Sequence, residues 1–540
     1  MAHRLDLARW RDAATATVGS GLLRPVGPVT GAKLLSGLWR TGLTPAAAVA
    51  IGAAKHSGRP VLVDDRGSVT YRELDCRMEA VAGALVQDAD APDSVAILCR
   101  NHRGFLEAMA VGSRLGAEVV LLNSEVTEAQ LARILGRHRP DVLVHDEEYA
   151  AIVDSSGFDG QRVVAWHDGA TNATTLDELA EHDGRPAPAN HRTGKLTLLT
   201  SGTTGLAKGV SRSVNPVAVA ESVATGMGVL RLREGDVAVI PPLFFHALGF
   251  ALLLSTLAVN GTVVCHRRFD ADQTLDDIAE HRATVLTGVP VMFQRLLAAR
   301  KERSDVDLSS IRVALTGASP ISPGTVREVM EVFGPVLVNL YGSTETGIVS
   351  MASPQDLLDE PSTLGRPGIG ISVRILRDDR SRCDVGERGT IFMRGGLMFE
   401  GYTEDGADTP EAKEVVDGHV NTGDMGHLDA KGRLYVDGRD DDMVVSGGEN
   451  VFPLEVEQVI AEHPDVDEAV VLGVRDEEFG QVLRAYVTLA EGCDDPGEQA
   501  LRDHVRGRLE KYKVPRQVVV VPDFPRNATG KILRSKIASD

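Results

Sequence analysis

Residues 198–210 read LLTSGTTGLAKGV, an apolar strand that runs directly into a loop of small residues. Between positions 200 and 209 stand four hydroxyl side chains, three glycines and a lysine. Glycine lets backbone N–H groups approach phosphate oxygens, hydroxyls add donors, and a lysine adds positive charge. The segment therefore predicts a phosphate-binding loop of an α/β protein. Its expected ligand residues are Thr200, Ser201, Gly202, Thr203, Thr204, Gly205 and Lys208.

Two other phosphate or nucleophile motifs are excluded by their spacing. A Walker A loop requires a Gly-Lys-Ser/Thr sequence, whereas Lys208 stands between Ala207 and Gly209. The segment 317–321, GASPI, resembles a hydrolase nucleophile elbow but ends in isoleucine where that motif has glycine. The sequence supports neither enzyme class.

The chain on both sides of the loop alternates apolar strands with amphipathic helices. Strands are expected at 61–63, 95–99, 117–123, 141–145 and 196–200. Thr70 and Glu73 form the sequence signature of a capping box that opens a helix, and Thr127 opens another. Continuous apolar strands separated by helices indicate mostly parallel sheets covered on both faces.

The pattern changes near residue 386. Short β segments follow, and beyond Pro453 a compact unit is expected: helix 454–463, strands 468–474 and 485–490, helix 498–512 and strand 517–521. The charged run 438–442 is a hinge candidate. The predicted fold is thus α/β, with a large N-terminal domain of mostly parallel sheets flanked by helices plus a small β subdomain, then a small mobile α+β domain. The predicted boundaries are 1–45 (N-terminal extension), 46–438 (large domain) and 439–540 (small domain).

Composition restricts the class of protein. The formal charge of −20 over 540 residues argues against a general nucleic-acid binder. Five scattered cysteines without a CxxC pair suggest reduced thiols, each a small core residue, and a cytoplasmic protein without a cleavable signal peptide. The uncharged stretch 237–265 is interrupted by prolines and leaves about 13 apolar residues, which is too short for a transmembrane span and favours a buried helix.

A set of motifs, in order along residues 60–537, resembles the adenylate-forming superfamily of acyl-CoA synthetases, adenylation domains and beetle luciferases. Besides SGTTGLAKG, they are TGAS (316–319), NLYGSTETG (339–347), GERGTIFMRG (386–395), NTGDMG (421–426), GRDDDMVVSGGENVFPLEVE (438–457) and RNATGKILR (526–534).

The resemblance implies a role for each matching residue. Glu345 would bind the Mg²⁺ that accompanies ATP, as suits a hard cation, and Thr344 would bond the α-phosphate. Lys531 would bridge the acyl carboxylate and the α-phosphate. The remaining nucleotide contacts would come from Gly317, Ala318, Ser319, Asn339 and Tyr341 at the adenine and from Asp424 and Arg439 at the ribose.

The resemblance also implies two half-reactions. A carboxylate and ATP are both anions, so Lys531 and Mg²⁺ would neutralise charge while an acyl adenylate forms and pyrophosphate leaves. The small domain would then rotate about Asp441, and coenzyme A would reach the adenylate along a tunnel that includes Gly447 and Gly448. ATP, Mg²⁺ and coenzyme A are the implied cofactors.

The acid itself is less well specified. His246, in the segment LFFH (243–246), stands where amino-acid-activating domains carry an aspartate, which argues against an amino acid. Nearby apolar residues either line a cavity or belong to the core: Phe250, Leu252, Leu253, Val289, Val291 and Met292. We expect a fatty acid of medium to long chain, with an aryl acid or transfer to a carrier-protein phosphopantetheine as alternatives.

The first 45 residues lie outside the resemblance. They carry six Lys or Arg against two acids among Leu, Val and Trp, unlike the acidic remainder. We expect them to pack on the large domain, while peripheral lipid contact and a homodimer stay open alternatives.

Overall fold

The computed structural model describes most of the chain. Its described residues are 2–22, 24–42, 44–87, 90–183, 186–189, 194–201, 207–210, 216–343, 346–395, 414–439, 443–446, 449–476, 480–490, 492–527 and 530–537.

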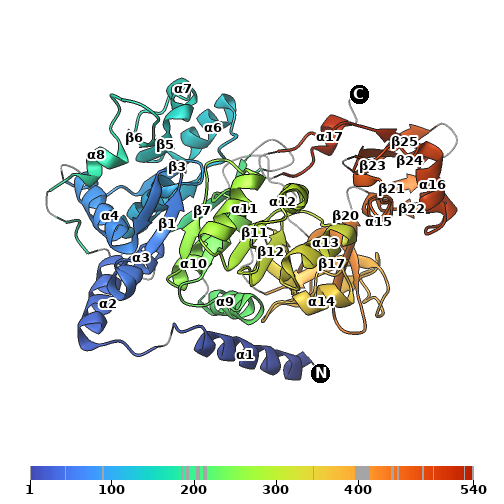
Figure 1. The fold of residues 1–540 in the computed structure, drawn as a ribbon, viewed down its shortest axis with the longest axis horizontal. Helices are drawn as coiled ribbons and strands as arrows, with labels where there is room; N and C mark the ends of the chain where they lie inside the picture. Colours follow the sequence, from blue (N-terminus) through green and yellow to red (C-terminus); the bar gives the residue numbers. More distant parts are fainter. Residues whose placement is uncertain are drawn as a thin grey trace.

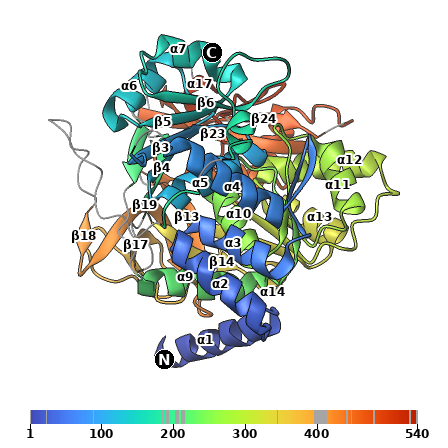
Figure 2. The ribbon, with the colours of Figure 1, turned by 90° about the vertical axis from the view of Figure 1, so that its left-hand side faces the viewer.

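Three helices open the chain: α1 (Ala2–Gly19), α2 (Pro28–Thr41) and α3 (Pro45–His56). Helix α1 lies along α9 (Pro216–Leu230), where the buried Ala13 meets Ala224 and Ile369. Helix α2 packs on α3, and the two N-terminal helices form the lower edge of the molecule (Figures 1 and 2). The expected packing of the N-terminal extension on the large domain is therefore observed.

Sheet A has the order β15-β14-β13-β12-β11-β9-β10-β1-β2. Its strands from β13 to β1 along this order are parallel, and β2, β14 and β15 are antiparallel edges. The strands are β1 (Pro60–Asp64), β2 (Gly67–Thr70), β9 (Val237–Val239), β10 (Thr262–Val264), β11 (Val285–Gly288), β12 (Val313–Gly317), β13 (Leu337–Ser343), β14 (Gly347–Ala352) and β15 (Arg366–Pro367).

Sheet B has the order β6-β5-β3-β4-β7-β8, parallel except for β8. Its strands are β3 (Ser94–Leu98), β4 (Glu118–Leu121), β5 (Val142–Asp146), β6 (Gln161–Trp166), β7 (Leu196–Ser201) and β8 (Ala207–Val210). Mostly parallel sheets are thus confirmed.

Helices cover both faces of each sheet. Residues of β3 alternate between two hydrophobic clusters, Val95 and Ile97 entering one and Ala96 and Leu98 the other, as the period of a strand requires. The first cluster fills the space between sheets A and B. The helices of the large domain beyond α3 are α4 (Tyr71–Leu85), α5 (Arg103–Leu115), α6 (Glu128–His138), η1 (Glu147–Tyr149), α7 (Ala150–Ser155), α8 (Leu176–Ala180), α10 (Ala247–Ala258), α11 (Ala271–Glu280), α12 (Pro290–Glu302), α13 (Pro323–Phe333) and α14 (Pro354–Asp359).

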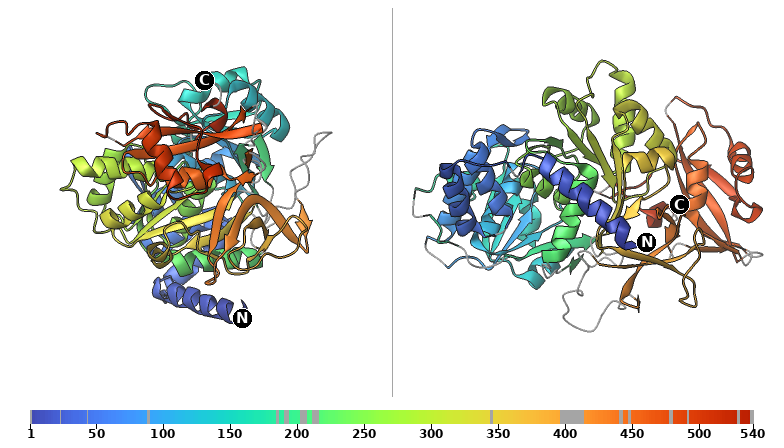
Figure 3. Two further views of the ribbon diagram at one scale, coloured as in Figure 1. Left: turned by 90° about the vertical axis from the view of Figure 1, so that its right-hand side faces the viewer. Right: turned by 90° about the horizontal axis from the view of Figure 1, so that it is seen from below.

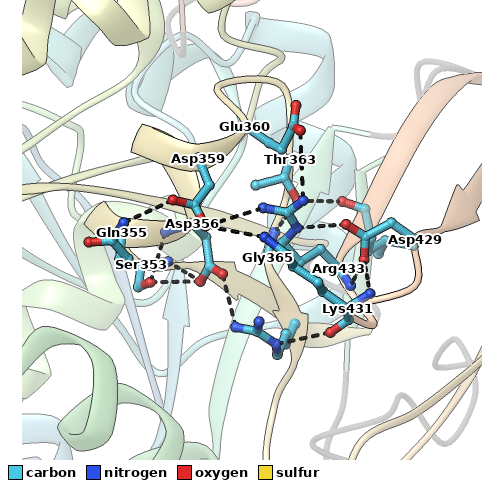
Figure 4. A network of polar contacts seen from close by, with 12 residues as sticks. Ser353, Gln355, Asp356, Asp359, Glu360, Thr363, Gly365, Asp429, Lys431 and Arg433 are labelled. Carbon is cyan, nitrogen blue, oxygen red and sulfur yellow. Dashed lines mark hydrogen bonds and ion pairs between the residues drawn. The ribbon is translucent and has the colours of Figure 1, made fainter.

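A third, antiparallel sheet forms the predicted β subdomain. It contains β16 (Ser372–Leu376), β17 (Gly389–Arg394), β18 (Val415–Val416), β19 (His419–Leu428) and β20 (Leu434–Arg439). The turn between β19 and β20 is tied to α14 through the buried Arg433, whose Nε lies 2.7 Å from Oδ2 of Asp429 and whose guanidinium also faces Asp359 and Glu360 (Figure 4).

The C-terminal unit is α+β, as expected. Its sheet contains β21 (Val444–Ser446), β22 (Glu449–Val451), β23 (Val466–Asp476), β24 (Gly480–Leu489) and β25 (Gln517–Val520), with α15 (Pro453–Ile460), α16 (Glu498–Arg506), η3 (Lys511–Lys513) and α17 (Arg534–Ile537). The unit has its own hydrophobic cluster and lies at one end of the molecule (Figures 1 and 3). The expected helix 498–512 is too long, because α16 ends at Arg506, where Gly507 follows.

Three expectations have separate outcomes. The stretch 237–265 does contain a buried helix, α10, and within the described residues no helix has both the length and the apolar character needed to cross a membrane. The domain boundary at 438/439 stays a prediction, because residues 440–442 lie outside the described part. The prediction that every cysteine is a core residue is wrong for Cys76, which lies on the solvent side of α4, whereas Cys99 and Cys265 are buried.

Candidate active site

Neighbouring strands bring the predicted adenine and ribose residues together. Strand β12 ends at Gly317, which pairs with Leu340 of β13, so that Asn339 and Tyr341 lie beside the end of β12. The hydroxyl of Tyr341 donates a hydrogen bond to Oδ2 of Asp424 in β19. Burial, and then the nearby Asp424 carboxylate, raise the pKa of Tyr341 well above its usual value, which keeps this donor protonated.

The backbone leaving β12 is strained. Ala318 has φ of 68°, in the left-handed region that non-glycine residues rarely occupy. A Cβ at Gly317 would lie 2.8 Å from the carbonyl oxygen of Leu340, so β13 approaches too closely for a side chain there. Strain of this kind persists only where the surroundings impose it, and it is concentrated at functional sites. The close approach of β13 therefore fixes the course of the chain as it leaves β12.

The two predicted ribose residues are paired across a hairpin. Asp424 in β19 lies opposite Arg439 in β20. Gly423, the residue before Asp424, has φ of +85°, and a Cβ placed there would lie 3.7 Å from Nη2 of Arg439. The guanidinium therefore lies over Gly423 and beside the Tyr341–Asp424 pair. A carboxylate and a guanidinium side by side suit a vicinal diol, to which they offer acceptors and donors.

Backbone and side-chain bonds join Lys531 and Gly530 to Asn527 in the C-terminal unit. The amide of Lys531 donates to Oδ1 of Asn527 at 2.9 Å, and the amide of Gly530 donates to the carbonyl of Asn527, also at 2.9 Å. Gly530 has φ of +76°, and a Cβ there would lie 2.7 Å from Cγ1 of Val291 and 3.2 Å from Cγ2 of Val289. The C-terminal loop thus contacts the large domain at two of the residues predicted near the acid.

His246 lies at the start of α10 and is packed against apolar groups. Its ring is 4.2 Å from the ring of Phe245, and its buried Nε2 has no hydrogen-bond partner within the described part of the chain. Burial lowers the pKa of His246 to about 4, so the imidazole is neutral at physiological pH. A neutral, unpaired ring nitrogen is able to donate to, or accept from, a bound molecule.

The other residues predicted near the acid belong to one hydrophobic cluster. Phe250, Leu252, Leu253 and Val289 are buried within it, and Val291 and Met292 pack against it while partly buried. These four buried side chains therefore belong to the hydrophobic core, one of the two possibilities that the sequence left open. Whether the set also lines a cavity stays a prediction.

Asn101, which the sequence analysis did not select, positions the His246 segment. It follows β3, and its Nδ2 donates to the carbonyls of Ile240 and Pro242 at 3.3 and 2.9 Å. Its Oδ1 accepts from the amide of Phe244 at 2.8 Å. These bonds link sheet B to the loop after β9 of sheet A. The one available signal was a polar residue shortly after an apolar strand. Its partners are 139 to 143 positions away, so they cannot be recognised from sequence.

The phosphate loop is described only at its edges. Thr200 and Ser201 end β7, where they pair with Lys208 and Ala207 of β8, so the two ends of the loop lie side by side. The predicted residues Gly202, Thr203, Thr204 and Gly205 lie outside the described residues, as do Thr344, Glu345, Gly447, Gly448 and the pivot Asp441. Ser319 lies two residues beyond β12, and its adenine role stays a prediction.

A buried group outside this site, formed by Cys99, His102 and Asp146, places one potential metal ligand each within 4.8 Å of the others. Its polar atoms are already in use. Nε2 of His102 is 2.8 Å from Asp146, Nδ1 accepts from the amide of Gly104, and Asp146 accepts from the amide of Arg100. Burial raises the pKa of the Cys99 thiol well above its usual value, which disfavours a thiolate ligand. We assign the group a structural role.

Comparison with known proteins covers both domains. The profile of the AMP-binding enzyme family matches residues 49–403, and that of the AMP-binding enzyme C-terminal domain matches residues 455–531. An indoleacetate–CoA ligase of Aromatoleum aromaticum is 32% identical over 494 residues, covering 90% of this chain and 96% of that protein.

Two solved structures show the same fold. An o-succinylbenzoate CoA synthetase of Bacillus subtilis, solved with its acyl-adenylate intermediate, has a TM-score of 0.76 and 29% identity, covering 91% of this chain and 98% of that one. The amide bond synthetase McbA of Marinactinospora thermotolerans has a TM-score of 0.79 and 27% identity with the same coverages, 91% and 98%.

Proposed function

The chain belongs to the AMP-binding enzyme family, and we propose that this ATP-dependent, AMP-forming acid–thiol ligase converts a ring-bearing carboxylic acid, ATP and coenzyme A into an acyl-CoA, AMP and pyrophosphate. The observation that supports this most directly is the contact of Gly530 with Val289 and Val291. It brings the loop of Lys531 to the same hydrophobic cluster that contains Phe245, the neighbour of His246.

The acid is proposed from the relatives and the site together. The sequence favoured a fatty acid, with an aryl acid as an alternative, and we now favour the aryl alternative. The named acids of the relatives above, indoleacetate and o-succinylbenzoate, both carry rings. The imidazole of His246, tilted against the buried ring of Phe245 at 4.2 Å, would be the aromatic group that meets the ring of the acid. The neutral imidazole of His246 removes the positive charge that would otherwise compete with Lys531 for the carboxylate.

The nucleotide is proposed to lie along the ends of β12, β13 and β19. Tyr341 and residues 317–319 would hold the adenine, and Asp424 and Arg439 the ribose. The bond from Tyr341 to Asp424 holds this carboxylate in place beside the proposed ribose position. Residues Thr200–Ser201 and Lys208 converge where the phosphates would follow. Glu345 is the residue we propose to hold Mg²⁺, whose positive charge would offset that of the phosphates.

In the first half-reaction Lys531 would lie between the acid and the α-phosphate. One carboxylate oxygen attacks phosphorus, the bond from phosphorus to the bridging oxygen breaks, and pyrophosphate leaves with the electron pair. Negative charge grows on the α-phosphate oxygens, where an ammonium group has its largest effect in a site that excludes water. In the second half-reaction the thiolate of coenzyme A attacks the acyl carbon and AMP leaves, a step that needs no cation from Lys531.

The test measures pyrophosphate release and acyl-CoA formation separately. Indoleacetate, o-succinylbenzoate and decanoate are offered with ATP, first alone and then with coenzyme A, an amine or a holo carrier protein. We expect pyrophosphate with a ring-bearing acid and thioester with coenzyme A. Preference for decanoate would restore the fatty-acid alternative, and product only with the amine or the carrier protein would reject coenzyme A as the acceptor.

A matched variant assigns the chemistry to Lys531. Lys531→Ala should lower pyrophosphate release by on the order of 10² to 10³ and leave thioester formation from supplied acyl adenylate near the wild-type rate. Equal losses in both steps would contradict the proposed division of labour.

A further inference from the structure

Helix α2 presents an apolar face to solvent. Leu35 and Trp39 have 72% and 65% of their surface exposed, and Val29 is equally exposed. One face of the helix carries Ala32, Leu35, Ser36 and Trp39, which recur at the three- and four-residue spacing of a helix. The opposite face carries the buried Gly37 and Thr41. Leu35 and Trp39 therefore point away from the protein body and do not contribute to its core.

Helix α1 repeats this arrangement. Leu7 and Val18 are about as exposed as Leu35, and Trp10 is exposed on the same side. The inward side carries Ala13, which packs into the cluster with Ala224. Seen from below, α1 crosses the front of the molecule (Figure 3, right), and α2 lies on the same lower edge (Figure 1). Both helices thus lie on one side of the protein, and each exposes apolar residues to solvent.

The tryptophans are unevenly distributed. The chain has three, of which Trp10 and Trp39 are on these helices and exposed. The third, Trp166, is buried and packs against His102 at a ring distance of 4.9 Å. Tryptophan has an apolar body and a polar N–H, and it is enriched where protein meets the headgroup region of a bilayer.

The charges around these helices complement anionic lipid. Arg11, Arg24 and Lys33 are exposed. Asp12, 4.0 Å from Arg11, is the one acidic side chain that the structure describes between residues 7 and 42, so the positive charges remain in excess. This local excess of positive charge contrasts with a chain of net charge −20. A second copy of the protein would bring two copies of the same positively charged surface together across a two-fold interface, whereas lipid phosphates would neutralise that charge.

We propose that α1 and α2 bind the surface of anionic phospholipid membranes, lying in the plane of the interface with Leu7, Trp10, Leu35 and Trp39 in the headgroup region and Arg11, Arg24 and Lys33 against lipid phosphates. Apolar side chains on one face and flanking cations are the features that hold amphipathic helices at a membrane surface. The surface acts independently of the acid or thiol used at the active site, so its test does not depend on the proposed function.

The full-length protein is sedimented with phosphatidylcholine vesicles, with and without phosphatidylglycerol. Binding should require the anionic lipid and should weaken as NaCl is raised. Leu35→Glu combined with Trp39→Glu should lower the vesicle partition coefficient about tenfold or more, since it removes two inserted side chains and adds two negative charges. Val385→Glu, at an apolar residue exposed elsewhere on the β subdomain, is the matched control and should bind as wild type.

Tryptophan fluorescence supplies a second readout. Vesicles should shift the wild-type emission to shorter wavelength, because Trp10 and Trp39 leave water while the buried Trp166 stays unchanged. Melting temperature and activity on a soluble acid should match wild type in the double variant, which excludes misfolding. Equal vesicle binding by wild type and double variant, or binding to neutral and anionic vesicles alike, would overturn the proposal. A third outcome would also overturn it: the wild type does not bind vesicles but associates with itself, and the double variant does not associate. The two helices would then form a protein–protein interface.

Discussion

Gly530→Ala tests whether the contact of the Lys531 loop with the large domain is needed for adenylation. The substitution has two costs. Any non-glycine residue at φ of +76° is strained by about 1–2 kcal/mol. In addition, the new Cβ would lie 2.7 Å from Cγ1 of Val291, whereas carbon atoms pack at roughly 3.5–4.0 Å. Because Val291 packs against the hydrophobic cluster and its branched side chain turns only with difficulty, we expect the loop to retreat by about 1 Å.

The size of the effect follows from that displacement. Lys531 is the next residue, so its backbone moves with Gly530. A misplacement of about 1 Å is enough to lower a rate by about 10²-fold. We therefore expect pyrophosphate release to fall about 10²-fold in single turnovers, while thioester formation from supplied acyl adenylate stays near wild type.

Two variants separate the contact from backbone strain. Gly492 also has φ of +76° in the C-terminal unit, but a Cβ there meets nothing within 4 Å. Gly492→Ala should lose similar stability and keep adenylation. Val291→Ala removes the atom that Gly530→Ala would strike, so the double variant should recover much of the rate. If Gly530→Ala and Gly492→Ala adenylate equally well, or if Val291→Ala gives no recovery, the contact does not position Lys531.

Four further changes have defined outcomes. Glu345→Gln should raise the Mg²⁺ concentration needed for half-maximal pyrophosphate release and leave the affinity for AMP nearly unchanged, since glutamine keeps the size of the side chain but not its charge. An equal loss of AMP binding would contradict a metal-binding role. Asp441→Pro should preserve adenylation and abolish transfer to coenzyme A, because proline fixes φ at about −65° at the proposed pivot. Wild-type rates for both steps would place the hinge elsewhere. Arg433→Met should lower the free energy of unfolding by about 3 kcal/mol in urea titrations, because it removes the buried partner of Asp429. The control is Lys431→Met on the exposed part of the same turn, which should lower it by about 1 kcal/mol or less. His246→Gln should make the protein less sensitive to acid. As the pH falls from about 6.5 to about 4, the wild type should lose up to about 3 kcal/mol of stability relative to the variant, because histidine in the unfolded chain takes up a proton before the buried imidazole does. Parallel pH profiles of stability would show that His246 is not desolvated.

Helix starts and turns that depend only on residues close together in the chain could be predicted from sequence. Thr70 and Glu73 make a reciprocal capping box at the start of α4, in which Thr70 accepts from the amide of Glu73 and Glu73 accepts from that of Thr70. The turn at 64–67, which joins β1 and β2, has the sequence Asp-Asp-Arg-Gly, a composition typical of hairpin turns. Helix α16 shows the limit, because the apolar pattern continues past Gly507 while the helix does not.

The site depends on contacts that no local pattern contains. The bonds of Asn101 join the ends of strands in two different sheets. The approach of Gly530 to Val291 depends on how two domains meet. Motif resemblance could select Lys531 and Asp424, since their chemistry lies in the motif. It could not select Asn101, whose role consists only of holding another segment in place.

The distribution of contacts between the domains suits the rotation proposed about Asp441. Near the proposed hinge the contacts are ion pairs: Arg388 lies 3.3 Å from Asp437, which precedes Asp441 closely in sequence, and 3.0 Å from Glu455 of the C-terminal unit. At the Lys531 loop the contact described above joins a glycine to valine methyl groups, and contacts of that kind are individually weak. A rotation about residues near 440 moves nearby groups least. The ion pairs can therefore persist while the loop withdraws, which is the order of events that two half-reactions at one site require.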